Sequence, residues 1–283
     1  MSVWLKVFQF YVYSNTHVAL AVVSLCLITG DVFDVSVEFS ASFLGLSTFF
    51  SYNAIRFFKY KTSKLRPELS LWFETNFRLL LLLNMTSLIV LLYIFCSIVT
   101  LKLLLFLFPF AMVTSAYMTP VFSRKNKNIS LRKIPGLKIF IIALTWASLV
   151  VVFPLIEQSK LFGFQEAMYL VLMINYVFIL TLPFDIRDAT FDPLTLKTIP
   201  QTIGVIKTKY LGVVLLIINA ILCIYFFHKQ VWISFVISNL ILMVLLCKSS
   251  TSQSRFFASF WVEGIPILHY ILLVGSEYVY VFK

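Results

Sequence analysis

A short acidic segment, Asp185-Ile-Arg-Asp188-Ala-Thr-Phe-Asp192, holds three of the five aspartates in this 283-residue chain. Their spacing of three and then four residues predicts that all three lie on one face of a helix. Like charges on one face repel, more strongly where water is scarce, and a divalent cation relieves that repulsion. Because Mg²⁺ prefers hard carboxylate oxygens, the pattern predicts a magnesium site at Asp185, Asp188 and Asp192. The alternative is a solvated helix end, neutralised by Arg187 and nearby lysines.

The residues that follow the acids predict a folded loop with a cation above the acidic face. Pro193 and Pro200 prevent a continuous helix, so the chain must turn between them. Lys197 and Thr198 lie within this turn. A lysine beside a carboxylate–metal cluster suits the remaining charge of a phosphate group. The alternative is a loop lysine that serves only membrane topology, beside an ordinary turn threonine.

The composition predicts an all-α integral membrane protein. Hydrophobic residues make up 60% of the chain and charged residues only 12%, whereas soluble domains carry about twice that charge. The net charge of +11 favours contact with anionic membrane lipids. Nucleic-acid binding is set aside because no soluble basic domain accompanies the apolar segments.

Nine apolar runs are long enough to cross about 30 Å of hydrocarbon as helices. They predict a single transmembrane domain over residues 1–283, and very short turns predict antiparallel packing of the third with the fourth run and the seventh with the eighth. The runs are 8–28, 38–58, 79–98, 100–121, 137–156, 164–184, 210–227, 231–247 and 256–280.

The distribution of lysine and arginine predicts how the chain lies in the membrane. Of the 23 basic residues, only Lys102, Lys160, Lys229 and Lys283 fall on the side opposite the amino terminus. By the positive-inside rule, the amino terminus and the loops after even-numbered runs are cytoplasmic. An odd number of spans then places the carboxyl terminus outside the cell membrane.

These features resemble the UbiA superfamily of membrane prenyltransferases. The segment Asp185 to Asp192, followed by Lys197-Thr-Ile-Pro200 and a glycine, is similar to the family's second aspartate-rich motif. The resemblance implies an all-helical bundle around a cytoplasmic-side cavity, in which acidic motifs hold Mg²⁺ on a prenyl diphosphate. It implies Asp185, Asp188 and Asp192 as metal ligands, with Asp188 and Lys197 in catalytic roles and Lys197 on the diphosphate. The prenyl group is then transferred to a lipophilic acceptor.

The chain departs from the family at the first motif, N-D-x-x-D-x-x-x-D. Asn53 matches the opening asparagine, but Phe57 and Lys61 stand at two aspartate positions. Half of the family's metal site is therefore missing. The same stretch offers Asn53, Arg56, Lys59 and Lys61 as diphosphate contacts, because fixed cations can substitute for metal charge. Alternatively, Arg56, Lys59 and Lys61 only reflect the enrichment of basic residues in cytoplasmic loops.

Three functions remain open from the sequence. The first is a divergent UbiA-like prenyltransferase that uses Mg²⁺ at the second motif. The second is a catalytically silent relative that binds an isoprenoid or lipid headgroup, or scaffolds a membrane partner. The third, a transporter, is disfavoured because the predicted spans carry few charges at mid-depth.

Overall fold

The computed structural model is almost entirely helical and describes residues 3–62, 65, 67–118, 122–124, 127–129, 131 and 134–281. Two three-residue strands pair antiparallel in a small hairpin between the fifth and sixth helices. The elements in chain order are α1 (Val3–Tyr13), α2 (Thr16–Phe33), α3 (Glu38–Lys61), α4 (Pro67–Ile98), α5 (Leu101–Met118), β1 (Phe122–Arg124), β2 (Lys127–Ile129), α6 (Leu137–Glu157), α7 (Phe164–Asp188), the 3₁₀ turn η2 (Leu194–Leu196), α8 (Ile199–Ile203), α9 (Val205–Phe226), α10 (Lys229–Lys248), the π-helical turn η3 (Phe257–Val262) and α11 (Ile265–Val281).

Within the described residues, seven helical segments are long and apolar enough to cross a membrane. These are Thr16–Phe33, Glu68–Ile98, Leu137–Glu157, Phe164–Asp188, Val205–Phe226, Lys229–Lys248 and Phe257–Ser276. The all-α membrane class is thereby confirmed, whereas the predicted count of nine spans is not. Helix α3 is not among the seven and carries charges at both ends, and the apolar part of α5 covers only Leu101–Ala116.

The first predicted span, 8–28, is interrupted. Helix α1 ends at Tyr13 and α2 begins at Thr16, because Asn15 adopts a left-handed backbone conformation with φ of 63°. Asparagine tolerates this conformation better than most residues. The last predicted span, 256–280, is likewise divided into η3 and α11. The predicted span 137–156 agrees with α6 to within one residue.

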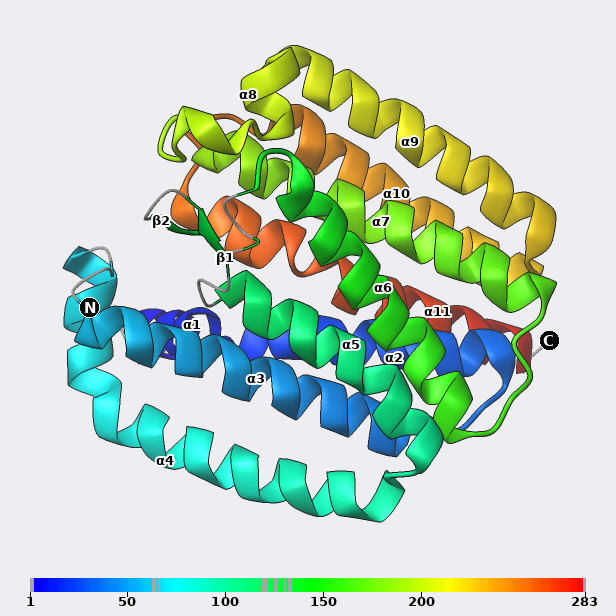
Figure 1. Ribbon diagram of the computed structural model, residues 1–283. Coiled ribbons are helices and arrows are strands. Elements are labelled where there is room, and N and C mark those ends of the chain that lie inside the picture. The colour runs from blue at the N-terminus through cyan, green and yellow to red at the C-terminus, as the bar shows by residue number, and fades with distance from the viewer. Residues whose placement is uncertain are drawn as a thin grey trace.

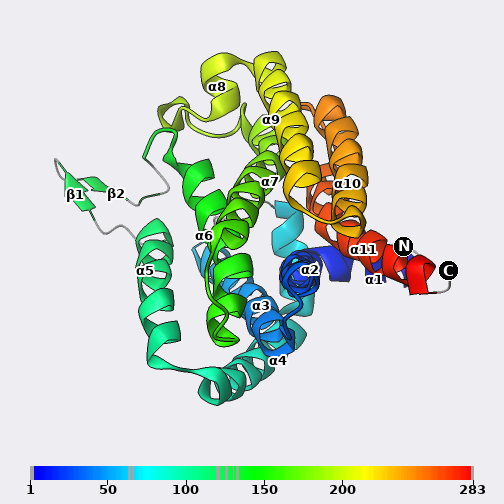
Figure 2. The same ribbon diagram turned by 90° about the vertical axis from the view of Figure 1, so that its right-hand side faces the viewer.

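The helices pack side by side around α2, α6 and α7, which contain much of the buried core (Figures 1 and 2). Helix α2 contacts α3, α6 and α11, and α7 lies between α6 and α9. Helices α9 and α10 pack together as their short connection predicts. Helices α4 and α5 instead diverge, and α5 packs on α6 (Figure 2). Many large side chains on α4 and α9 face outward, as expected for helices in contact with lipid.

The chain crosses the bundle back and forth, so its longer polar connections gather at one end (Figure 1). The end of α3, the start of α6 and the end of α7 all lie there, together with η2 and α8. We call this the charged end of the bundle, and define it by residues 53–61, 136–138 and 185–204. All the site residues predicted from the sequence lie in the first and third of these segments.

Candidate functional site

Helix α7 brings the predicted aspartates to the charged end but does not include all three. The helix stops at Asp188, and the amides of Phe191 and Asp192 both donate to the Asp188 carbonyl oxygen, at 2.9 and 2.8 Å. Asp192 therefore lies in a turn, and the expectation that three acids share one helical face is wrong for it. The turn nevertheless folds back, so that the charges of Asp188 and Asp192 both act on Asp185.

A lysine from another helix lies between two of these acids. Lys138, in the first turn of α6, donates to Oδ1 of the buried Asp185 at 2.7 Å. Its Nζ atom is also 3.6 Å from Oδ2 of Asp192. An ammonium group thus occupies the position between two carboxylates where a bridging cation is expected.

The third acid is neutralised by its neighbour. The Arg187 guanidinium forms two parallel hydrogen bonds with Asp188, each 2.9 Å long. Together, Asp185, Asp188, Asp192, Lys138 and Arg187 form a group that we call the charge cluster. A bidentate guanidinium–carboxylate pair is among the stronger ion pairs in proteins. Every acid of the predicted magnesium site therefore has a cationic partner from the protein.

This pairing bears directly on the predicted magnesium site. Mg²⁺ needs several oxygen ligands in near-octahedral order. Within the part of the chain that the structure describes, no three His, Cys, Asp or Glu side chains are grouped so that they could hold a metal ion. In this arrangement the acids do not fit Mg²⁺, because Lys138 and Arg187 take up their oxygens.

The loop after α7 holds Lys197 away from the acids. Lys197 is exposed, with a left-handed backbone (φ 44°) between η2 and α8. Among the described residues, no hydrogen bond or ion pair joins its ammonium group to the three aspartates. The side chain of Gln201 fastens the loop by donating to the carbonyl oxygens of Ala189 and Asp192, at 3.2 and 2.9 Å. Lys138 thus takes the place beside the acids that was predicted for Lys197.

Arg56, on α3, is a further cation that is linked electrostatically to the charge cluster through Glu263. Its Nη1 atom is buried and has no hydrogen-bond partner within the described part of the chain. The carboxylate of Glu263, which follows η3, interacts electrostatically with both Arg56 and Arg187. One carboxylate therefore acts on guanidinium groups from both α3 and α7, and the Nη1 atom of Arg56 can still donate to an additional anion.

Asn53 serves the fold. Its Nδ2 atom donates to the carbonyl oxygens of Ser14 and Phe49, at 2.9 and 3.0 Å. Its Oδ1 atom accepts a 2.9 Å hydrogen bond from the side chain of Asn15. The side chain is fully buried, so its hydrogen-bonding groups hold the break between α1 and α2 against α3.

We expect Asn53→Ala to lower the free energy of unfolding by about 3 kcal/mol, because buried polar groups left without partners cost about 1–3 kcal/mol each. Thermal denaturation in detergent measures this loss. Asn76→Ala is the matched control, since the side chain of Asn76 donates to the Trp72 carbonyl oxygen within its own helix, and it should cost less than about 1 kcal/mol. Equal losses for the two variants would contradict a structural role for Asn53.

The other residues of the degenerate first motif face in different directions. Phe57 packs against Phe73 and Phe77 of α4, with ring centroids 4.9 and 5.3 Å away. This position therefore contributes to the α3–α4 contact and not to the charge cluster. Lys61 is exposed at the last residue of α3, and Lys59 lies one turn after Arg56. Of the three predicted cations, Arg56 is linked electrostatically to the charge cluster, through Glu263.

Two residues of the site were missed in the sequence. Lys138 is one of many basic residues in the loops, and Glu263 is an acid within an otherwise apolar run. Lys138 is separated from Asp185 by 47 positions, and no local spacing relates them. A charged residue within an otherwise apolar run was the one available signal for Glu263.

No protein-family model, curated protein or solved structure matches this chain.

Proposed function

We propose that this chain is a UbiA-like membrane protein that binds a prenyl diphosphate at the charged end of its bundle and transfers the prenyl group to a lipophilic acceptor. In this proposal the amino terminus and the charged end are cytoplasmic, and α3 and α5 cross the membrane together with the seven apolar segments. Protein cations, rather than a cage of metal ligands, hold the diphosphate.

The observation that carries the proposal is the buried Nη1 atom of Arg56, which has no hydrogen-bond partner in the described residues. A buried donor without an acceptor is costly, so such a group is expected to meet a ligand or water. Guanidinium groups match phosphate oxygens in charge and in geometry. Because the charge of Glu263 acts on both Arg56 and Arg187, we place a diphosphate between these two guanidinium groups.

The residues suggest how the site would assist prenyl transfer. Negative charge develops on the diphosphate as its bond to the prenyl carbon breaks, and fixed cations nearby stabilise that charge. Arg56 and Arg187 supply these cations, and the charge of Glu263 acts on both of them. Lys138 offsets part of the negative charge of Asp185 and Asp192, which limits their repulsion of the incoming phosphate groups.

A silent binding protein is the second candidate. Asn53 and Phe57 stand at positions of the family's first motif, yet one fastens α1 to α3 and the other packs on α4. These contacts favour retention of headgroup binding over retention of catalysis.

The decisive experiment supplies purified protein in lipid nanodiscs with labelled prenyl diphosphates and a lipid extract as acceptor, with and without Mg²⁺. We expect saturable binding that does not require Mg²⁺, and release of pyrophosphate with label transferred to lipid. Binding without any turnover would support the silent protein. Binding and turnover that occur only with Mg²⁺, and that Asp188→Asn abolishes, would support metal-assisted transfer instead. Absence of binding under both conditions would overturn the proposal.

A further inference from the structure

Three polar side chains meet in the interior of the bundle, halfway along three of its apolar segments. Tyr176 is the central residue of α7, and Asn239 lies at the middle of α10. His269 lies within one turn of the middle of the segment Phe257–Ser276. All three side chains are buried, and we call them the mid-bundle polar cluster. At this depth lipid tails surround the helices, so bulk water does not reach the cluster from the sides.

Packing brings these side chains together from three helices. The ring centroid of His269 lies 6.2 Å from that of Tyr176 and 5.3 Å from that of Phe235 on α10. Asn239 follows Phe235 by one turn, on the same face of α10. Ser238 acts on the hydroxyl of Tyr176, but its own hydroxyl donates to the Phe235 carbonyl oxygen at 2.8 Å. Polar groups of α7, α10 and α11 therefore gather in one layer of the bundle.

Within the part of the chain that the structure describes, the polar atoms of the cluster have no hydrogen-bond partners. They are both ring nitrogens of His269, both polar side-chain atoms of Asn239 and the hydroxyl of Tyr176. The neighbouring Asn219 differs, because its Oδ1 atom accepts from Asn175 at 3.1 Å and its Nδ2 atom donates to a carbonyl oxygen of α7. Five buried atoms left unsatisfied would together cost as much as the whole net stability of a typical domain. The cluster therefore requires an occupant.

The polar atoms define the chemistry of that occupant. A neutral His269 ring offers one donor and one acceptor, and Asn239 and Tyr176 each offer both kinds of group. A metal ion would leave the donors of the amide without acceptors, and an anion would leave the acceptors without donors. A small neutral molecule that both donates and accepts satisfies the whole set, and water is the smallest such molecule.

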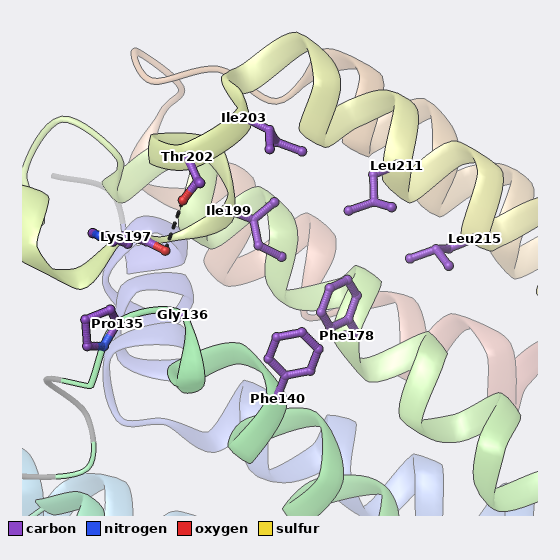
Figure 3. Close-up of a pocket in the computed structure, with 10 residues that line it drawn as sticks. All are labelled: Pro135, Gly136, Phe140, Phe178, Lys197, Ile199, Thr202, Ile203, Leu211 and Leu215. Carbon is purple, nitrogen blue, oxygen red and sulfur yellow. Dashed lines mark hydrogen bonds between the residues drawn. The ribbon is translucent and has the colours of Figure 1, made fainter.

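A groove of about 580 Å³ on the flank of the bundle does not supply these partners (Figure 3). Phe178 lines this groove from α7, opposite Phe140 of α6. Tyr176 lies two residues earlier and faces Phe235 and His269 instead. Since two residues turn a helix by about half a circle, α7 separates the groove from the cluster. The helices therefore enclose the occupant.

We propose that the mid-bundle polar cluster holds ordered water molecules that hydrogen-bond to Tyr176, Asn239 and His269. This water joins α7, α10 and α11 in the middle of the membrane, as buried water joins polar groups in the interiors of other proteins. The proposal does not depend on prenyl diphosphate binding, because none of the three residues belongs to the charge cluster.

The test is hydroxyl-radical labelling of the wild-type protein in nanodiscs, with the radicals produced by a short X-ray pulse. Radicals that form from bound water modify the side chains beside it, so we expect labelling of Tyr176 and His269 despite their burial. Phe153 is the matched control, because it is equally buried but its ring stacks on Phe43. After correction for the intrinsic reactivity of each side chain, labelling of Tyr176 and His269 as slow as that of Phe153 would overturn the proposal.

Two apolar variants test the same water through stability. His269→Phe and Asn239→Leu leave the water with fewer partners, so each should lower the melting temperature by about 2–10 °C. Each should also slow the labelling of Tyr176 toward the rate of Phe153. If the cluster is dry, the same changes remove unpartnered polar groups and should raise the melting temperature. A rise in both variants would overturn the proposal.

The exposed His228 at the start of α10 provides the control for stability, and His228→Phe should shift the melting temperature by less than about 2 °C. An equal fall in this variant would remove the support from the other two. The labelling of the wild type needs no variant, so it decides the matter if His269→Phe or Asn239→Leu does not fold.

A lipid-soluble occupant would give a different pair of results. Tyr176 would stay unlabelled, and organic extraction of the denatured wild type would release a compound with a hydroxyl or carbonyl group. The same extraction of His269→Phe would release none. These two results together would assign the cluster to that compound and overturn the proposal of bound water.

Discussion

Replacement of Arg56 by methionine should weaken prenyl diphosphate binding by about tenfold to a hundredfold. The buried Nη1 atom of Arg56 has no partner within the described residues, and a hydrogen bond to a charged group contributes about 1.5–3 kcal/mol. Methionine keeps the length of the side chain and its apolar packing but removes the charge. Equilibrium binding of a labelled prenyl diphosphate in nanodiscs measures the effect.

Two further variants show whether the effect belongs to the guanidinium group. Lys61→Met removes an exposed cation from the end of the same helix and should change affinity by less than about twofold, because exposed charges are screened. Arg56→Lys keeps the charge without the planar fork, so its affinity should be intermediate. If Arg56→Met binds the prenyl diphosphate with wild-type affinity, Arg56 does not bind this ligand and the proposed function loses its main support.

Stability must be separated from binding in this series. Arg56→Met leaves Glu263 with Arg187 as its partner, and a buried carboxylate with less compensation destabilises the fold. The double variant Arg56→Met/Glu263→Gln removes both charges and should recover most of the lost melting temperature. The affinity of this double variant for the prenyl diphosphate should remain weak, as in Arg56→Met. Recovery of binding along with stability would assign Arg56 to the fold alone.

The sequence predicted much of the helical arrangement because length and apolarity govern membrane helices. The predicted segment 137–156 lies within α6, whose start after Gly136 coincides with the change from polar to apolar residues. The segment 8–28 failed for a tertiary reason. The left-handed conformation of Asn15 is held by a hydrogen bond to Asn53, 38 positions away, and no local pattern in the first span announces that contact.

The sequence predicted the acids of the candidate site but missed Lys138, the cation between two of them. Asp185 and Asp188 could be singled out because acids are rare in so apolar a chain. Lys138 could not, because loop lysines are common in membrane proteins and serve topology. Its selection depends on how α6 packs against α7, which brings its Nζ atom to 2.7 Å from Asp185. The repulsion between the acids predicted a positive charge beside them. The structure supplies this charge as the ammonium group of Lys138 and not as a magnesium ion.

The ammonium group of Lys138 beside the acids leads to the second prediction with a large expected effect. Lys138→Met should lower the free energy of unfolding by about 3–5 kcal/mol, because it leaves the buried Asp185 without its partner. Lys138→Met/Asp185→Asn should recover most of this loss, since neither charge then remains unpaired. Lys207→Met, at an exposed lysine near the start of α9, should stay within about 0.5 kcal/mol of the wild type. Thermal denaturation in detergent measures all three variants.

The same variant decides between an ammonium group and a metal ion as the partner of the acids. Without Lys138, the part of the chain that the structure describes leaves no cation between the carboxylates of Asp185 and Asp192, so Mg²⁺ should raise the melting temperature of Lys138→Met in proportion to its occupancy. The wild type should show no such rise, since its lysine already supplies the charge. A rise of equal size in the wild type would mean that Mg²⁺ displaces the lysine, and the site predicted from the spacing of the acids would then be restored.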